Sequence, residues 1–263
     1  MTARNTPPGL AILREPTELD IVDRDGLAVA FAWPQTGSFH RAMHRVDLAV
    51  GGRTKPQCHP GEAAYTVSTG SVDVESPGGV ISAPAPSVVF VPAATRYAFA
   101  ATMESTIFGG PCPPDPALYA DQYAPPSKAK GNAGVRVFDP KNEGLPIPMI
   151  SRQGRLVVWP GIGAESATMV YVILEPGDAN DPHEHESSDD TIAILEGRGS
   201  IDNLTDGTTH EFEAGDVVFV RAGVRHAVKA DRGSRIVATG GPCPPDYRML
   251  ESIGAVEPSR EHL

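Results

Sequence analysis

The chain has 263 residues, 40% of them hydrophobic, which is enough for one large domain or two small domains with buried cores. Its formal net charge is −11, and this shortage of Lys and Arg argues against a nucleic-acid partner or an anionic membrane surface. The three cysteines, Cys58, Cys112 and Cys243, are far apart, no apolar run reaches about 18 residues, and the N-terminus lacks a secretory signal pattern. These features predict a cytoplasmic protein without a membrane span.

Three segments of the first half recur in the same order in the second half, displaced by about 130 residues. The only two tryptophans, Trp33 and Trp159, fall at matching places in the first pair. The pairs are Ile21–Pro34 with Met149–Pro160, Pro86–Ala98 with Gly215–Ala227, and the heptapeptide GGPCPPD at Gly109–Asp115 and at Gly240–Asp246. Ordered echoes at a nearly constant offset indicate a duplicated domain.

The segment between the two halves, residues 124–134, is rich in Pro, Gly, Ser and Lys, as is typical of a linker. We therefore predict an N-terminal unit over 1–123, a linker over 124–134 and a C-terminal unit over 135–263. Short apolar runs such as Thr168–Gly177 alternate with turn residues in both halves. This pattern favours two all-β units of the barrel or jelly-roll type.

The second half contains a candidate metal site. His183 and His185 are two residues apart, so both would face the same side of an extended segment. Asp190 opens the apolar run that follows, and Gly215–His226 supplies a strand, a glycine turn and a third histidine. Two antiparallel neighbours could bring these side chains to one point, and such a nitrogen and oxygen donor set suits iron, manganese, nickel, copper or zinc. By itself, a His-X-His pair beside acidic residues is more often a solvated loop.

These two segments together resemble the two motifs of the cupin superfamily. The residues at the motif places are Gly177, His183, His185, Asp190 and Gly197 in the first, and Gly215, Arg221, Gly223, His226 and Ala230 in the second. Three of them depart from the usual pattern: Asp190 stands for Glu, Arg221 for Pro and Ala230 for Asn. The resemblance implies two tandem cupin jelly-roll barrels, a bicupin. It also implies one divalent transition metal, iron or manganese preferred and nickel, copper or zinc as alternatives, held by His183, His185, Asp190 and His226. Asp189 is the alternative acidic ligand, although the spacing to Gly197 favours Asp190.

In the first half, the corresponding places carry Gln57, His59, Ala63 and Tyr97. An amide, an imidazole and a phenol without a carboxylate make a poor divalent metal site, so we predict a degenerate N-terminal site. Glu62 could restore only a weak one. The matching Cys112 and Cys243 are interpreted as parts of a structural turn.

Strand alternation from the ligands predicts an aliphatic pocket lined by Ile192, Ile194, Val224 and Val228. Such walls favour a partly apolar small molecule with a few chelating oxygens. Bicupins with three histidines and one acid include quercetinase-like dioxygenases, manganese oxalate oxidases and decarboxylases, and ureidoglycine aminohydrolase. The resemblance thus implies a metal-dependent enzyme, first a dioxygenase-type oxygenase using dioxygen and second a non-redox lyase, isomerase or aminohydrolase. A non-catalytic small-molecule-binding cupin is the alternative of another class. A homodimer or a higher homo-oligomer is also expected.

Overall fold

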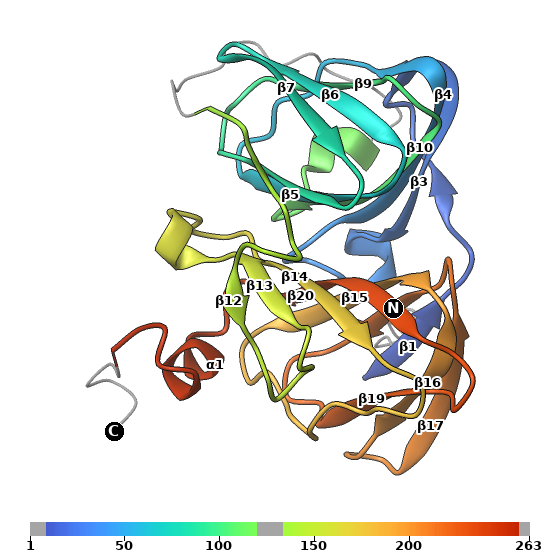
Figure 1. Cartoon of the computed structure of the whole chain (residues 1–263), viewed down its shortest axis with the longest axis vertical. Coiled ribbons are helices and arrows are strands. Elements are labelled where there is room, and N and C mark those ends of the chain that lie inside the picture. The colour runs from blue at the N-terminus through green and yellow to red at the C-terminus, as the bar shows by residue number, and fades with distance from the viewer. Residues whose placement is uncertain (1–8, 120–133, 258–263) are drawn as a thin grey trace, which may run out of the picture.

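The computed structural model describes residues 9–119 and 134–257, which form two β-barrels stacked along the long axis of the molecule (Figure 1). The N-terminal barrel is built from a ten-stranded sheet, and the C-terminal barrel from a seven-stranded and a three-stranded sheet. Among the described residues, helix is limited to three short 3₁₀ turns and α1 (Tyr247–Ser252). None of these helical segments has the length and apolar composition needed to cross a bilayer. The predicted all-β, two-barrel fold is confirmed.

The ten-stranded sheet contains β2 (Thr17–Glu18), β3 (Val22–Ala32), β4 (Met43–Thr54), β5 (Glu62–Thr69), β6 (Ser71–Ser76), β7 (Gly79–Pro84), β8 (Ser87–Val91), β9 (Ala98–Ala101), β10 (Ser105–Cys112) and β11 (Arg136–Phe138). The seven-stranded sheet contains β1 (Leu10–Leu13), β12 (Leu145–Pro146), β13 (Arg155–Val158), β14 (Met169–Leu174), β15 (Asp189–Glu196), β18 (Val217–Val220) and β20 (Ile236–Cys243). The three-stranded sheet contains β16 (Arg198–Asn203), β17 (Thr208–Glu213) and β19 (His226–Ala230). The 3₁₀ turns are η1 (Pro34–Thr36), η2 (Pro116–Tyr119) and η3 (Pro160–Ile162).

The sequence repeats occupy equivalent positions in the two barrels. Trp33 and Trp159 directly precede η1 and η3, and the two heptapeptides close β10 and β20. Gly109 and Gly240 have φ angles of 144° and 137°. A Cβ at these glycines would lie 2.1 Å from the Ala64 carbonyl oxygen and 1.8 Å from the Thr191 carbonyl oxygen. Close strand approach therefore explains why both copies of the heptapeptide contain this glycine.

Two strands cross the predicted unit boundaries. β1, from the N-terminal end of the described chain, pairs antiparallel with β18 of the C-terminal barrel. β11, which follows the linker region, pairs antiparallel with β8 of the N-terminal barrel. Each added strand covers an outer strand whose backbone groups would otherwise lack partners on that side. This exchange depends on long-range pairing, which a repeat in the sequence does not reveal. The predicted linker lies outside the described residues except for Gly134.

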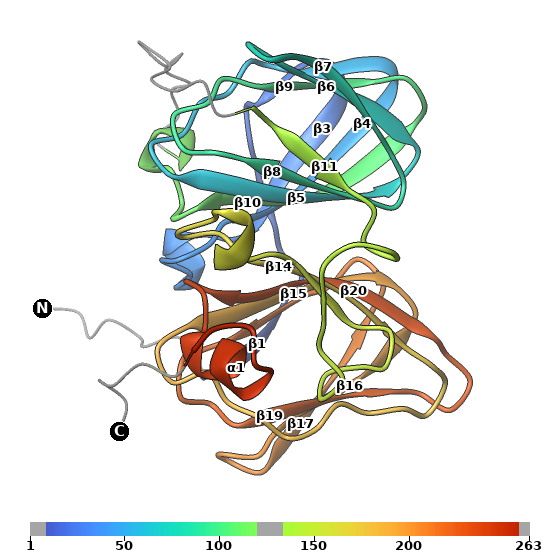
Figure 2. The same ribbon diagram turned by 60° about the vertical axis from the view of Figure 1, so that its left-hand side comes forward.

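The two barrels share a packed junction in which β5, β8 and β10 face β14, β15 and β20 (Figure 2). Phe90 and Cys112 of one barrel pack in the same apolar cluster as Tyr171, Ile173 and Cys243 of the other. This cluster, together with the buried cores inside each barrel, fixes the C-terminal barrel on a rigid support.

The buried His44 on β4 makes folding stability depend on pH. Its Nε2 lies 2.8 Å from the Tyr119 hydroxyl, and burial lowers its pKa to about 3. Below an ordinary pKa of about 6.5, the unfolded chain takes up a proton that folded His44 cannot accept, so stability falls as the pH falls. We expect His44 to account for a loss of about 2 kcal/mol between about pH 7 and about pH 5. Urea unfolding of the wild type and of His44→Gln at both pH values measures this, and an equal loss in both proteins would contradict it.

Candidate metal centre

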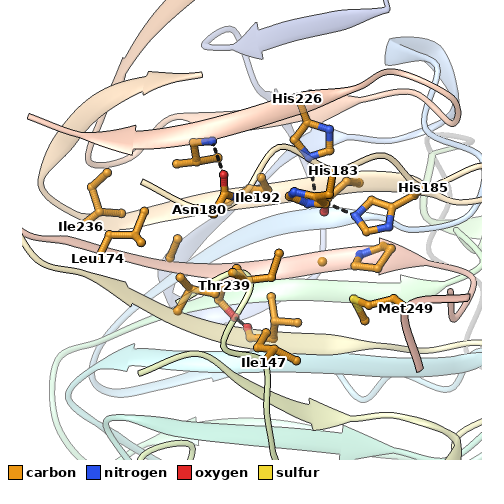
Figure 3. A pocket seen from close by; sticks show the side chains of 18 residues that line it. Ile147, Leu174, Asn180, His183, His185, Ile192, His226, Ile236, Thr239 and Met249 are labelled. Carbon is orange, nitrogen blue, oxygen red and sulfur yellow. Dashed lines mark hydrogen bonds and ion pairs between the residues drawn. The ribbon is translucent and has the colours of Figure 1, made fainter. Parts of the chain in front are cut away.

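Four side chains predicted as ligands converge in the C-terminal barrel, and Figure 3 shows the three histidines among them close together. His183 and His226 are backbone partners, with N–H···O distances of 3.0 and 2.8 Å in the two directions. His185 follows on the same extended segment, and Asp190 projects from β15. One ligand atom from each of the four residues lies within 4.8 Å of the others. Segments 43 residues apart in sequence, from His183 to His226, are thus joined at a single point.

The three imidazole rings are held with the same nitrogen facing inward. The Nδ1 atoms of His183 and His226 donate to the backbone carbonyl oxygens of Asp181 and Val224, at 2.8 and 2.9 Å. Nδ1 of His185 donates to the Asp246 carboxylate at 2.6 Å. Because Nδ1 carries the proton in each ring, Nε2 keeps its lone pair for a metal.

Two buried atoms at the convergence point have no hydrogen-bond partner among the described residues. They are Asp190 Oδ1 and His226 Nε2. Asp190 is 5% exposed and His226 is 1% exposed, so water does not readily satisfy either atom. Leaving such atoms unpaired is costly, and a divalent cation between them would remove the cost. The donor set therefore fits a single divalent ion.

The protonation states also suit metal binding. Burial, together with His226 and His185, lowers the pKa of His183 to about 4, so the ring is neutral near neutral pH. Burial opposes the ionisation of Asp190, but the nearby His226, whose Nε2 lies 3.7 Å from the carboxylate, and the other two histidines outweigh it and lower the pKa of the carboxyl. Neutral imidazoles and an ionised carboxylate are the forms that bind metal.

The neighbouring acid, Asp189, points away from this cluster. Its carboxylate lies 3.1 Å from Nδ1 of His40, in the N-terminal barrel, and accepts a hydrogen bond from the backbone of Ala222 at 3.1 Å. Successive residues of a strand face opposite sides, so only one of the two acids can face the histidines. The structure gives that position to Asp190.

A pocket with a volume of about 50 Å³ opens beside the cluster, which is room for on the order of four water molecules. Ile192 and Val228 line it, as the alternation predicts. Ile194 and Val224 do not: Ile194 lies fully buried in the barrel core, and Val224 packs beside Gly9. The register of β15 is regular up to Ile194, so Ile194 faces the barrel interior as the alternation predicts, but it packs in the core away from the pocket. Further lining comes from Ile147, Ile150, Val170, Val172, Leu174, Asn180, Ile236, Ala238, Thr239, Gly241, Pro242 and Met249.

Asp246 belongs to the candidate site, although the sequence patterns did not single it out. It is the last residue of the second heptapeptide, it orients His185, and it caps α1 by accepting from the backbone of Met249. In the first heptapeptide, Asp115 holds Nδ1 of His59 in the same way, at 2.9 Å. The signal was present in the sequence, since both copies of the heptapeptide end in Asp.

The N-terminal counterpart is closed by its own side chains. Nε2 of His59 lies 2.9 Å from the Tyr97 hydroxyl, which in turn lies 2.5 Å from the hydroxyl of Tyr65. Gln57 is the backbone partner of Tyr97, and Ala63 offers no ligand atom. The hydroxyl of Tyr97 thus occupies the hydrogen-bonding position at Nε2 of His59, the nitrogen that would otherwise face a metal. Glu62 faces the other barrel, where the backbone nitrogens of Glu165, Ser166 and Ala167 donate to its carboxylate.

Replacing Asp246 by Asn is expected to weaken metal binding about 10–100-fold, because the neutral amide holds the His185 ring less firmly and lowers its basicity. Equilibrium dialysis against manganese measures the affinity. Asp115→Asn changes the equivalent residue of the closed N-terminal site and is the matched control, for which we expect no change. A normal affinity in the Asp246 variant would contradict the role given to this carboxylate.

Residues 170–238 match the family model described as a cupin domain. The C-terminal barrel is therefore similar to cupin domains. The matched range begins in β14 and ends within β20, and it includes all four residues of the cluster. No curated protein sequence matches the chain significantly.

Solved structures with two cupin-type barrels resemble nearly the whole chain. The oxalate decarboxylase of Lactobacillus farciminis in its formate complex is 12% identical, with 90% of this chain and 86% of that chain covered and a TM-score of 0.65. A Bacillus subtilis oxalate decarboxylase structure, described for its Mn(II) centres, is 12% identical, with 90% and 77% covered and a TM-score of 0.65. AerE from Microcystis aeruginosa is 12% identical, with 88% and 98% covered and a TM-score of 0.62. At these identities the likeness establishes the bicupin fold across both barrels.

Proposed function

We propose that the C-terminal cupin barrel is a metal-dependent enzyme that acts on a small organic molecule. The observation that carries the proposal is the cluster of His183, His185, Asp190 and His226, in which two buried polar atoms have no partner among the described residues. Three imidazole nitrogens and one carboxylate oxygen would hold one divalent transition metal, with manganese or iron preferred. The likeness to a fold that holds Mn(II) in an oxalate decarboxylase supports manganese.

The side chains at this site would have three roles: holding the metal, shielding it from water and orienting a ligand. The four side chains would hold the ion and would leave part of its coordination shell free for ligands from the pocket. A bound metal would supply a Lewis acid and a centre for chemistry with dioxygen. Ile192 and Val228 would exclude water from these positions, and Asp246 would keep the His185 ring in its orientation.

We place a dioxygenase-type oxygenase first among the possible reactions. Among the described residues that line the pocket, the four proposed ligands are the only ones with titratable side chains. Lyases, isomerases and aminohydrolases commonly rely on a separate side chain that transfers a proton in the reaction. An oxygenase whose substrate and dioxygen meet at the metal has less need of one, so the aliphatic pocket favours it.

A non-redox reaction is the second candidate, favoured by the likeness to the oxalate decarboxylase fold. A small-molecule-binding cupin without catalysis is the third. A homodimer or higher oligomer and a cytoplasmic location remain predictions.

Oxygen consumption separates these candidates. Protein loaded with iron or manganese would be given a panel of catechols and enols in an oxygen electrode. We expect metal-dependent oxygen uptake that His185→Ala abolishes. Conversion that proceeds equally well without oxygen would favour the non-redox enzyme, and saturable binding without conversion across the panel would favour the non-catalytic protein.

A further inference from the structure

The pocket beside the cluster has no positively charged side chain among its described lining residues. Its walls are mainly aliphatic, from residues such as Leu174, Ile192 and Ile236 (Figure 3). The buried cation Arg41 does not line the pocket and instead donates to the hydroxyl of Thr168 at 3.1 Å. If one carboxylate of a substrate bound the metal, a second carboxylate of the same substrate would therefore have no positively charged side chain of the lining to pair with.

The surface beside the pocket is acidic. A neighbouring hollow shares Ile150, Met249 and two of the histidines with the pocket, so the two adjoin at the cluster. The acidic side chains that line the hollow come from Asp181, Glu184 and Asp246. Among the described residues that line it, the one Lys or Arg side chain, Arg248, is paired with Glu186. Acidic side chains this close to the pocket repel multiply charged anions and leave neutral molecules unaffected.

The charge balance at the cluster points the same way. A divalent ion bound by Asp190 would carry a net charge of about +1, because the three histidines are neutral ligands. The Asp246 carboxylate, bonded to the back of His185, reduces the local charge further. A chelating ligand that brings one negative charge is accommodated, whereas a dianion leaves an uncompensated charge among aliphatic side chains.

Asn180 provides the pocket with one oriented hydrogen-bond donor. Its Oδ1 accepts from the backbone nitrogen of Val228 at 2.7 Å, and this bond fixes which end of the amide is oxygen. The Nδ2 group has no partner among the described residues, and the side chain lines the pocket (Figure 3). The hydroxyl of Thr239, the other uncharged polar side chain in the lining, is already bonded to the Val170 carbonyl oxygen at 2.9 Å.

We propose that this site selects a small oxygen chelator with an apolar body and at most one negative charge, such as a hydroxy-ketone or an enol. Asn180 is the specificity-determining residue that donates to an oxygen of that substrate. The site excludes dicarboxylates. This inference rests on the proposed metal site and narrows its substrate class.

Two matched ligands test the proposal on the full chain loaded with manganese. Allomaltol and comenate share one hydroxy-pyrone chelating group, and a methyl in the first is replaced by a carboxylate in the second. Calorimetry should show at least about tenfold tighter binding of allomaltol, since the extra carboxylate is buried without a partner. Comenate binding as tightly as allomaltol, or more tightly, would overturn the charge selectivity.

Asn180→Asp tests the donor. The variant keeps an oxygen for the Val228 nitrogen but replaces the amide Nδ2 group, a donor, with a carboxylate oxygen, an acceptor, so allomaltol should bind at least about tenfold more weakly. Metal content, measured in the same samples, should remain at the wild-type level. Unchanged allomaltol affinity would overturn the role of Asn180. A wild-type protein that takes up no metal would instead refute the proposed function, and the two failures are therefore distinguishable.

Discussion

The Asp190→Ala variant is expected to purify with almost no bound metal and to show no metal-dependent activity. The substitution removes the only carboxylate of the cluster and leaves three neutral imidazoles. Because altering even the hydrogen-bond partner of a ligand costs about 10–100-fold in affinity, loss of the ligand itself should cost more than about 100-fold. Elemental analysis and manganese titration measure the effect.

Asp189→Asn is the matched control, because the two acids are adjacent on β15 and face opposite ways. This variant loses only the contact with the half-exposed His40, which is worth at most about 1 kcal/mol. It should keep its full metal content. Metal loss in Asp189→Asn combined with retention in Asp190→Ala would show that the two acids have been assigned the wrong way round.

Among the substitutions considered, removal of the Glu62 carboxylate is expected to lower the free energy of unfolding the most. Glu62 is 6% exposed at the start of β5, and its carboxylate accepts from the backbone nitrogens of Glu165, Ser166 and Ala167 at 2.8 to 3.0 Å. The Ser166 hydroxyl donates to the same carboxylate at 3.1 Å. Glu62→Ala leaves these donors without an acceptor, partly open to water. We expect the free energy of unfolding to fall by about 2–4 kcal/mol.

Chemical denaturation of the metal-free protein measures this change. Glu62→Gln, which keeps one carbonyl oxygen, should lose less than Glu62→Ala. Because Glu62 lies in the junction and outside the C-terminal pocket, metal affinity should remain within about threefold of the wild type while the protein is folded. Stability of Glu62→Ala within about 0.5 kcal/mol of the wild type would contradict the junction role.

Glu62 and Asp189 also illustrate how the duplication builds the junction. Each acid immediately precedes the acidic ligand place of its barrel, Ala63 or Asp190, and each turns outward because strand residues alternate. Glu62 accepts hydrogen bonds from the loop that follows η3 in the C-terminal barrel. Asp189 forms a hydrogen bond with His40, in the loop that follows η1 in the N-terminal barrel. Equivalent residues of the two barrels thus hold equivalent loops of the opposite barrel.

Local patterns and the internal repeat predicted the fold class, and the resemblance to the two cupin motifs identified the residues that meet at the cluster. The glycine and histidine spacings depend on strand geometry and turns, which are short-range properties. The pairing of β1 with the C-terminal barrel and of β11 with the N-terminal barrel depends on contacts between distant segments, and no periodicity encodes them.

Side-chain partners were predictable only where the repeat preserved them. Asp246 recurs as Asp115, so the repeated Asp could have indicated a role beyond a turn. Asn180 has no such signal, because its function depends on the bond that Val228 makes with its oxygen. Alternation gives the direction in which Ile194 points but not its distance from the cluster, and Val224 lies in the turn before β19, where strand alternation does not apply.

Anomalous scattering from crystals grown with manganese tests the central claim most directly. We predict one strong anomalous peak per chain, surrounded by Nε2 of His183, His185 and His226 and by the carboxylate of Asp190, with no peak beside His59 and Tyr97. A peak in the N-terminal barrel, or a manganese ion bound elsewhere while these four residues remain uncoordinated, would contradict it.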